Sequence, residues 1–360
     1  MKILYITPTI YDEGGVAKVI SVKTNTLIEA YHCKIGVVTF NNDLTDTFHS
    51  YHPSIEKFDV KATGFKPLKI FNYYQKVKEI IKEYQPDVII ICDFGWKGFF
   101  FSKWLKTTIP VVFEVHGSLY NESKKIENKK LLNYRAFIRK KLLFGYKNVI
   151  FLSKLSQNEW NKKGEIIPNP IQITNQVAPL KNHTAIAIAR HSYEKGIDRL
   201  ITIWEKVAQN SNWTLEIYGD GYLFEKHQNQ IEELGLNDKI KLFKPVKNIQ
   251  GKFLEASLFV MTSRTEGFPM ALLEAMEVGL PVIAYDCPIG PRSILTNEHS
   301  GFLIEDGNEN EFVAKVLALQ NDEATRERIG QNAKQEMQKL HPDVIGKMWF
   351  DYFTSLTSKS

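Results

Sequence analysis

Short apolar segments alternate with segments of helical character along most of this sequence. The apolar segments are residues 2–6, 34–40, 87–92, 111–116 and 149–152, followed by 184–189, 213–218, 240–246, 258–263, 280–285 and 301–304. The helical segments include residues 16–30, 71–84, 309–319 and 342–357. Strands that alternate with helices favour parallel sheets, whose ligands bind beyond the carboxyl ends of the strands. We therefore predict an α/β fold.

Residues 264–291 combine a loop, a short helix, a buried strand and a second loop. Pro269 suits the first turn of the helix, and Gly279 can end it in a left-handed conformation. Glu266 lies in the loop and Glu274 inside the helix. A helix N-terminus favours anions, and a carboxylate beside it can accept hydrogen bonds from hydroxyls. Anion and polyol recognition side by side suggests a nucleotide sugar as ligand.

The same stretch carries a family resemblance. Glu266 and Glu274 stand in the setting E-G-F-P-x-x-L-L-E-A-M-x-x-G-L-P-V-I, which resembles the retaining glycosyltransferases of the GT-B fold, specifically family four. The alternative is a surface glutamate and a solvated helical glutamate. The resemblance implies two Rossmann-like domains whose parallel sheets face a central cleft. We place the acceptor-side domain at residues 1–170 and the donor-binding domain at 171–340, and expect residues 341–360 to form a helix that crosses back to the first domain.

The resemblance also implies roles for residues of the second domain. Arg190 and Lys195, in the setting A-R-x4-K-G, would neutralise the leaving diphosphate, although an isolated pair of this kind is more often two surface cations. Glu274 would bind the ribose, while Glu266 would either bind and orient the donor sugar or act as a covalent nucleophile. The remaining implied donor-binding residues are Gly219, Gly267, Phe268, Pro269 and Met270. Pro245 stands where a glycine is more usual, which leaves recognition of the base unassigned.

Three residues of the first domain join this set. Gly14 and Gly15 lie between a strand and a helix, where glycines allow close approach of a phosphate or sugar. His116 is the last residue of the predicted strand 111–116. A single histidine in such a place is usually a loop or core residue, but in the resembled family it lines the sugar site.

The expected reaction is metal-independent, because no Asp-x-Asp occurs in the sequence and the two cations would replace the metal. The resemblance implies retaining transfer of a hexose or N-acetylhexosamine from a nucleotide sugar, expected to be a UDP-sugar, to a saccharide hydroxyl in bacterial cell-surface glycan synthesis. No cofactor beyond the donor is expected. Two alternatives remain open, namely a UDP-sugar epimerase on the same fold and a non-catalytic partner subunit.

Charge is distributed unevenly between the two parts of the chain. Residues 1–165 carry 26 lysines and arginines against 16 aspartates and glutamates, whereas the remaining residues carry 20 against 25. Residues 124–144 predict a basic amphipathic helix, and residues 94–106 mix aromatic residues with lysines. Such segments lie on anionic bilayers, or else turn an apolar stripe to the core and their lysines to solvent. We expect an anionic membrane surface and a lipid-linked acceptor rather than nucleic acid, for which no recognisable module is present.

The remaining features predict a cytoplasmic protein at the inner face of the cell membrane. No apolar run reaches the ~18 residues that a membrane-spanning helix needs. The apolar start of the chain turns polar at Thr7, too early for a signal peptide. Cys33, Cys92 and Cys287 are too widely spaced for a zinc site and odd in number, so we expect free thiols.

Overall fold

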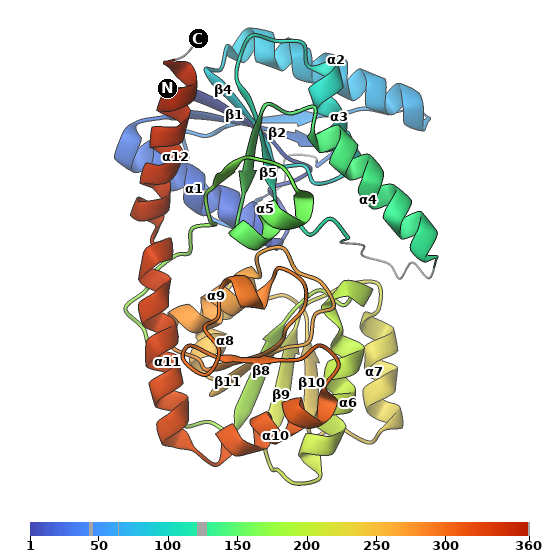
Figure 1. Cartoon of the computed structure of the whole chain (residues 1–360), viewed down its shortest axis with the longest axis vertical. Coiled ribbons are helices and arrows are strands. Elements are labelled where there is room, and N and C mark those ends of the chain that lie inside the picture. The colour runs from blue at the N-terminus through green and yellow to red at the C-terminus, as the bar shows by residue number, and fades with distance from the viewer. Residues whose placement is uncertain (43–45, 64, 121–127, 359–360) are drawn as a thin grey trace. The chain divides into compact units, whose positions relative to one another are not determined.

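The computed structural model describes residues 1–42, 46–63, 65–120 and 128–358. The chain divides into two compact units (Figure 1). The first unit comprises residues 1–119, 130–170 and 340–360, and the second comprises residues 120–129 and 171–339.

The described residues of the first unit form a seven-stranded sheet in which all neighbouring strands are parallel. The strand order is β3-β2-β1-β4-β5-β6-β7. The strands are β1 (Lys2–Ile6), β2 (Lys34–Phe40), β3 (Glu56–Val60), β4 (Val88–Ile91), β5 (Val111–Val115), β6 (Asn148–Phe151) and β7 (Glu165–Ile166). The helices are α1 (Gly15–Tyr31), α2 (Lys66–Tyr84), α3 (Trp96–Trp104), α4 (Lys129–Leu143), α5 (Lys154–Trp160) and α12 (Pro342–Thr357). Buried aromatic rings dominate one face of this sheet, with Phe99 stacked on Phe113 at 5.0 Å and on Trp160 at 5.9 Å.

The described residues of the second unit form a six-stranded sheet, also parallel throughout, in the order β10-β9-β8-β11-β12-β13. Its strands are β8 (Thr184–Ile188), β9 (Thr214–Tyr218), β10 (Ile240–Phe243), β11 (Leu258–Met261), β12 (Val282–Tyr285) and β13 (Phe302–Ile304). Its helices are η1 (Tyr193–Lys195), α6 (Ile197–Ala208), α7 (Phe224–Glu233), α8 (Ile249–Leu254), α9 (Met270–Glu277), η2 (Pro291–Ser293), α10 (Glu309–Gln320) and α11 (Glu323–Met337), and η3 (Gln338–Leu340) follows. Helix α6 shows why the sequence folds this way, because its apolar residues recur every three or four positions and Leu200, Ile203 and Trp204 are fully buried.

Both strand orders reverse direction at an internal pair of strands. In the first sheet the reversal lies between β1 and β4, and in the second between β8 and β11. The order 3-2-1-4-5-6 is that of Rossmann folds, in which ligands bind beyond the carboxyl ends of the strands at this switch point. The predicted α/β fold with two Rossmann-like domains is therefore confirmed.

The C-terminal helix α12 belongs to the first unit, as predicted, and packs against α1 (Figure 1). The Phe350 ring stacks on Tyr31 with centroids 4.4 Å apart. A Cβ atom at Gly346 would lie 2.7 Å from Thr26, so the absence of a side chain there allows the two helices to approach closely.

Several predicted boundaries differ from the structure. Helix α2 begins at Lys66 rather than Phe71, and α9 begins at Met270, so Pro269 precedes the helix instead of lying in its first turn. The predicted helix over 124–144 begins at Lys129 and ends at Leu143, while residues 124–127 lie outside the described residues. Gly279, which follows the last helical residue Glu277 and the C-cap Val278 of α9, has a φ of +79°, the left-handed conformation that was predicted.

Candidate active site

The switch point of the second sheet brings together residues from three neighbouring strands. Strand β8 leads to Arg190 and Lys195, and its neighbour β11 leads to Glu266. Strand β9, on the other side of β8, leads to Gly219. These four predicted site residues are far apart in sequence but share one edge of the sheet, because the carboxyl ends of parallel strands meet there.

Lys195 and Glu266 form the central contact. The Lys195 ammonium donates a hydrogen bond to Glu266 Oε1 at 2.7 Å, and the Ser263 hydroxyl donates to the same oxygen at 2.7 Å. The side chain of Lys195 is 21% exposed, whereas Glu266 is buried. An ammonium in this setting is held in place by one carboxylate and can still meet an anionic ligand from solvent.

Arg264 links the loop after β11 to the loop after β8, a role that no sequence pattern predicts. Its guanidinium donates to both carboxylate oxygens of Asp198, at 2.8 and 2.6 Å, and to the Tyr193 carbonyl at 2.8 Å. Burial alone would raise the pKa of Asp198, but its hydrogen bonds and ion pair with Arg264 hold that pKa below its usual value. Thr262 Oγ1 also donates to the Gly196 carbonyl at 2.9 Å. The position of Lys195 is therefore fixed from both loops.

Arg190 lies at the surface beside this contact. Its side chain is 62% exposed, and Nη2 lies 3.3 Å from Oε1 of the buried Glu194. The alternative interpretation of Arg190 and Lys195 as two surface cations therefore fits the exposed Arg190 but not Lys195.

Gly219 packs directly against the backbone that leads to Arg190. A Cβ atom at Gly219 would lie 2.0 Å from the carbonyl oxygen of Ala189, and one at Gly221 would lie 2.5 Å from that of His191. Neither approach leaves room for a side chain. Gly219 therefore allows two neighbouring strand ends to come close, which is a structural reason for glycine at this position.

His191 is a further buried residue of this loop. Its Nδ1 lies 2.9 Å from Nδ1 of His227, and both residues are at most 1% exposed. Burial, followed by the neighbouring histidine, lowers the pKa of His191 to about 4. At neutral pH the buried imidazole of His191, next to Arg190 in this loop, is therefore uncharged.

The remaining predicted donor-binding residues lie at the start of α9 or within it. Phe268 and Pro269 are buried, while Gly267, Met270 and Glu274 are half-buried. Glu274 lies on α9 between the buried pairs Leu272–Leu273 and Ala275–Met276. It is therefore on a rigid element just one turn from the helix N-terminus, where an anionic group is favoured.

The loop after β12 also contacts Glu266. Ile289 forms a parallel β-bridge with Glu266 and has a φ of +69°, an outlier for a β-branched residue. A Cβ atom at Gly290 would lie 2.5 Å from the Glu266 Cβ. Strained backbone of this kind persists only where its surroundings over-determine it, and it clusters at functional sites.

The other predicted residues lie in the first unit. Gly14 precedes α1 and donates its N–H to Asp12 Oδ1 at 3.1 Å, and Gly15 is the first residue of the helix. His116 follows β5, and 5% of its side chain is exposed. Its Nε2 lies 3.6 Å from Glu114 Oε2, and no described residue accepts or donates a hydrogen bond at this nitrogen.

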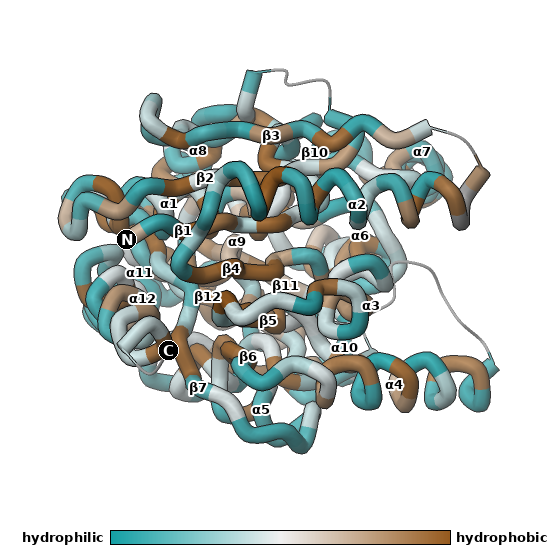
Figure 2. The backbone as a smooth tube through the Cα atoms, turned by 90° about the horizontal axis from the view of Figure 1, so that it is seen from above, coloured by the Kyte–Doolittle hydropathy of each residue, from teal (hydrophilic) through white to brown (hydrophobic). Residues whose placement is uncertain are grey.

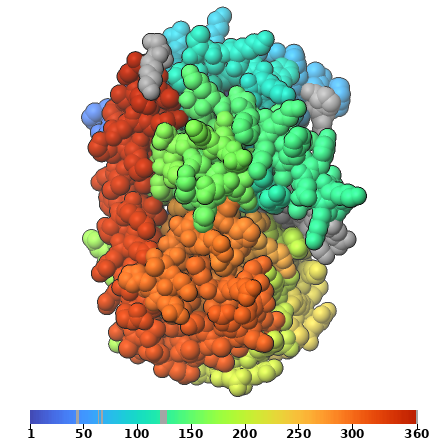
Figure 3. Space-filling model, viewed as in Figure 1, coloured from blue at the N-terminus to red at the C-terminus, as the bar shows by residue number. Residues whose placement is uncertain are grey.

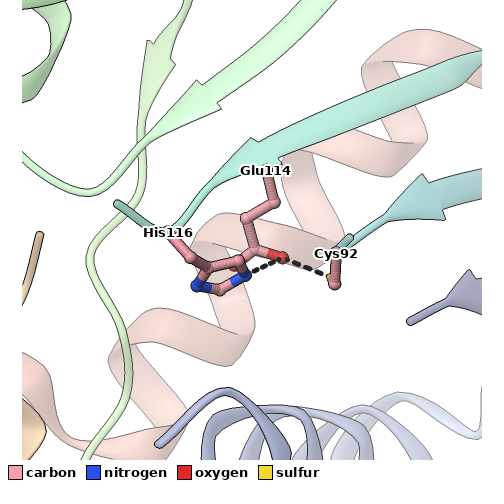
Figure 4. Close-up of side chains that lie close together, drawn as sticks. All are labelled: Cys92, Glu114 and His116. Carbon is pink, nitrogen blue, oxygen red and sulfur yellow. Dashed lines mark hydrogen bonds and ion pairs between the residues drawn. The ribbon is translucent and has the colours of Figure 1, made fainter. Parts of the chain in front are cut away.

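Cys92, Glu114 and His116 form a cluster of the residue types that bind metals (Figure 4). One ligand atom from each lies within 4.8 Å of the others. However, the Lys23 ammonium donates to both oxygens of Glu114, at 2.7 and 2.6 Å, and already supplies a positive charge to the carboxylate. Burial, followed by the Glu114 charge, raises the pKa of the Cys92 thiol. A protonated thiol and a carboxylate paired with lysine do not fit a metal centre.

Two Rossmann-like units, with cations and a carboxylate at the switch point of the second, are the arrangement that the resemblance to GT-B glycosyltransferases implied. The family model described as Glycosyltransferase Family 4 matches residues 14–175, and that described as Glycosyl transferases group 1 matches residues 170–336. The chain belongs to this glycosyltransferase family, as the pattern around Glu266 and Glu274 predicted.

Similar proteins cover most or nearly all of the chain. The amylovoran biosynthesis glycosyltransferase AmsD of Erwinia amylovora is 25% identical over 97% of this chain and 99% of its own length. The lipopolysaccharide 1,6-galactosyltransferase of Escherichia coli K12 is 29% identical over 77% of this chain and 83% of its own. A crystal structure of Staphylococcus aureus TarM in complex with UDP matches with a TM-score of 0.84 at 16% identity, covering 98% of this chain and 99% of that one. This last likeness confirms the GT-B fold.

Proposed function

We propose that this glycosyltransferase moves a hexose or N-acetylhexosamine from a UDP-sugar to a hydroxyl of a saccharide acceptor in bacterial cell-surface glycan synthesis, with retention of anomeric configuration. The observation that carries the proposal is the Lys195–Glu266 contact at the switch point. Arg190 precedes Lys195 on the loop after β8, and Glu274 lies one turn into α9. It supplies cations for a diphosphate and carboxylates for hydroxyls within one unit. The relatives named for surface polysaccharides and the TarM complex with UDP support the choice of pathway class and nucleotide.

The chemistry follows from the charges. Breaking the bond between the sugar and the diphosphate leaves negative charge on the departing phosphate oxygen. Lys195 and Arg190 stabilise that charge, and the free N–H groups at the start of α9 add to the effect. Glu266 accepts hydrogen bonds from the sugar hydroxyls and orients the ring, while Glu274 accepts them from the ribose. The acceptor hydroxyl attacks the face from which the phosphate leaves and transfers its proton to the leaving phosphate oxygen.

The proposal is tested by a screen of nucleotide sugars, measuring UDP release with and without lipid-linked saccharide acceptors. We expect acceptor-dependent release with at least one UDP-hexose or UDP-N-acetylhexosamine, and a product with the anomeric configuration of the donor. An inverted product would contradict retention. Conversion of a UDP-sugar to its epimer without any acceptor would instead support an epimerase.

We expect turnover to survive removal of divalent metals. Lys195 and Arg190 provide the positive charge that a metal would otherwise bring to the diphosphate, so excess EDTA should change the rate of UDP release by less than about twofold. The measurement is the initial rate after dialysis against EDTA and again after addition of Mg²⁺ or Mn²⁺. Loss of activity with chelator and its recovery with metal would show that the two cations do not suffice.

We also propose that the acceptor is lipid-linked and that α4 holds the protein at an anionic membrane surface. A stripe along α4 combines Tyr134 and Phe137, which are 61% and 62% exposed, with Lys130 and Lys141, and Phe144 follows the helix. Helix α4 lies at the surface in Figure 3, and apolar and hydrophilic residues alternate along it in Figure 2. Among the described residues no helix is long and apolar enough to cross a bilayer. Exposed aromatic residues with interspersed lysines fit the headgroup region of an anionic bilayer.

Sedimentation with vesicles that contain phosphatidylglycerol tests this surface. We expect the Tyr134→Ser/Phe137→Ser variant to lose about tenfold or more in vesicle affinity, because two rings leave the bilayer interface. Lys141→Ser should lose about fivefold, an effect that high salt removes. Val344→Ser, at an exposed apolar residue of α12, is the control and should bind as the wild type does. Equal binding by all variants would exclude α4 as the membrane surface.

A further inference from the structure

The first unit buries an ion pair that the proposed reaction does not use directly. Lys23 of α1 and Glu114 of β5 are each 1% exposed, and the ammonium contacts both carboxylate oxygens. Removing two charges from water costs several kcal/mol per ion, so such pairs are often no better for stability than apolar side chains of the same size. Stability of the fold is therefore a weak explanation for this buried ion pair. Its position next to His116 suggests a different role.

Glu114 Oε2 is the atom at which the cluster converges (Figure 4). It lies 2.6 Å from the Lys23 ammonium, 3.2 Å from the Cys92 sulfur and 3.6 Å from His116 Nε2. Burial would raise the pKa of Glu114, but the opposing effects of Lys23 and His116 keep that pKa below its usual value. The His116 ring thus faces a carboxylate that is ionised throughout the neutral range.

The far side of Lys23 is closed by the C-terminal helix. The ammonium lies 4.2 Å from the centre of the Trp349 ring of α12 and 5.4 Å from the Tyr5 ring. Trp349 is fully buried. Aromatic faces of this kind stabilise a desolvated cation, and here they pack against the ammonium that contacts Glu114.

We infer that Lys23, Glu114 and Trp349 are positioning residues that hold the His116 ring in the orientation needed for transfer. Trp349 fixes the ammonium, the ammonium fixes the carboxylate, and the carboxylate faces Nε2. The inference rests on the proposed function and on the role that the family resemblance implies for His116, which is to line the sugar site. It adds that three residues, one each from α1, β5 and α12, together keep the ring of a fourth residue, His116, in position.

A double-mutant cycle separates an effect through His116 from a general loss of stability. We expect Glu114→Gln to lower kcat by about tenfold to a hundredfold with little change in the KM for the donor, as small displacements of reacting groups do. In a His116→Ala background the same substitution should cause no further loss. Asp59→Asn removes another partly buried carboxylate of the first unit, one that accepts from Thr39 and Asn42, and should leave kcat unchanged.

An apolar replacement tests the structural role separately. Lys23→Met/Glu114→Leu should unfold at a denaturant concentration similar to that of the wild type, yet retain the low kcat of Glu114→Gln. Normal kcat in this variant, or an equal loss from Glu114→Gln with and without His116, would overturn the inference. The ring signals of His116 in NMR spectra provide a readout that needs no activity. We expect one sharp set in the wild type and broadened or doubled signals in Glu114→Gln.

These outcomes also distinguish the inference from the function on which it rests. Absence of transfer in the wild type together with the expected NMR change would reject the proposed reaction but retain the positioning of the ring. Unchanged ring signals in Glu114→Gln would reject the positioning even if transfer is observed. An active His116→Ala variant with wild-type kcat would show that the ring has no part in the reaction, and would overturn the inference as well.

Discussion

Replacing Lys195 with alanine is expected to lower kcat by about a hundredfold to a thousandfold while the protein remains folded. The loss has this size because the ammonium stabilises charge that develops on the leaving diphosphate, and removing one such preorganised group usually costs that much. The substitution also removes the Lys195 hydrogen bond to Glu266 Oε1 and leaves the one from the Ser263 hydroxyl. The measurement is the rate of UDP release under saturating donor, with unfolding followed in parallel.

The matched control is Lys206→Ala. Lys206 lies on α6 of the same unit and forms an ion pair of similar length, 2.8 Å to Glu309, away from the switch point. Its side chain is 45% exposed, and surface pairs of this kind contribute little to stability. We expect wild-type kcat in this variant. A loss in Lys195→Ala no larger than that in Lys206→Ala would remove Lys195 from the site.

Glu266→Gln is expected to lower kcat by about a hundredfold and to leave measurable turnover. Glutamine keeps the length of the side chain but loses the charge that pairs with Lys195 and strengthens hydrogen bonds from sugar hydroxyls. If Glu266 were a covalent nucleophile, the loss should be roughly a millionfold, as for other enzymes without their nucleophile. The size of the loss therefore distinguishes an orienting carboxylate from a nucleophilic one.

Ser263→Ala serves as the companion variant. It removes the second hydrogen bond to Glu266 Oε1 and leaves the charge in place. We expect kcat to fall by about fivefold to tenfold, because the lost hydrogen bond contributes about 1 kcal/mol to holding the carboxylate in place. Trapping of a glycosyl-enzyme on Glu266, detected as a mass increase of one sugar residue, would support the nucleophile and contradict the orienting role.

The sequence was sufficient for the elements and for the residues of the second unit that follow strand ends. Arg190, Lys195 and Glu266 lie in the loops that follow two apolar strands recognisable in the sequence, so the parallel topology predicts that they converge. The hydrogen bonds and ion pairs within the site could not be predicted from this topology. Arg264 and Asp198 are 66 residues apart, and no local pattern specifies that one clamps the other.

The sequence contains a pattern from which the Lys23–Glu114 pair could have been predicted. Glu114 interrupts the apolar strand Val111–Val115, and Lys23 lies among the buried residues of α1. A charge in a buried strand requires a partner, and a buried lysine is the natural candidate. Edge strand β3 and helix α11 were missed for a different reason, since β3 is largely exposed and α11 is mostly polar, which weakens the periodic pattern of each.

Because residues 340–360 pack in the first unit, that unit is assembled from segments synthesised at very different times. Domains generally fold as units during synthesis, the N-terminal one first. Here residues 1–170 emerge from the ribosome without α12, so Trp349 cannot cover Lys23 until the whole second unit has been translated. During that interval Lys23 lacks the Trp349 ring that covers its ammonium in the folded unit, so this buried ion pair can be completed only after translation has reached α12.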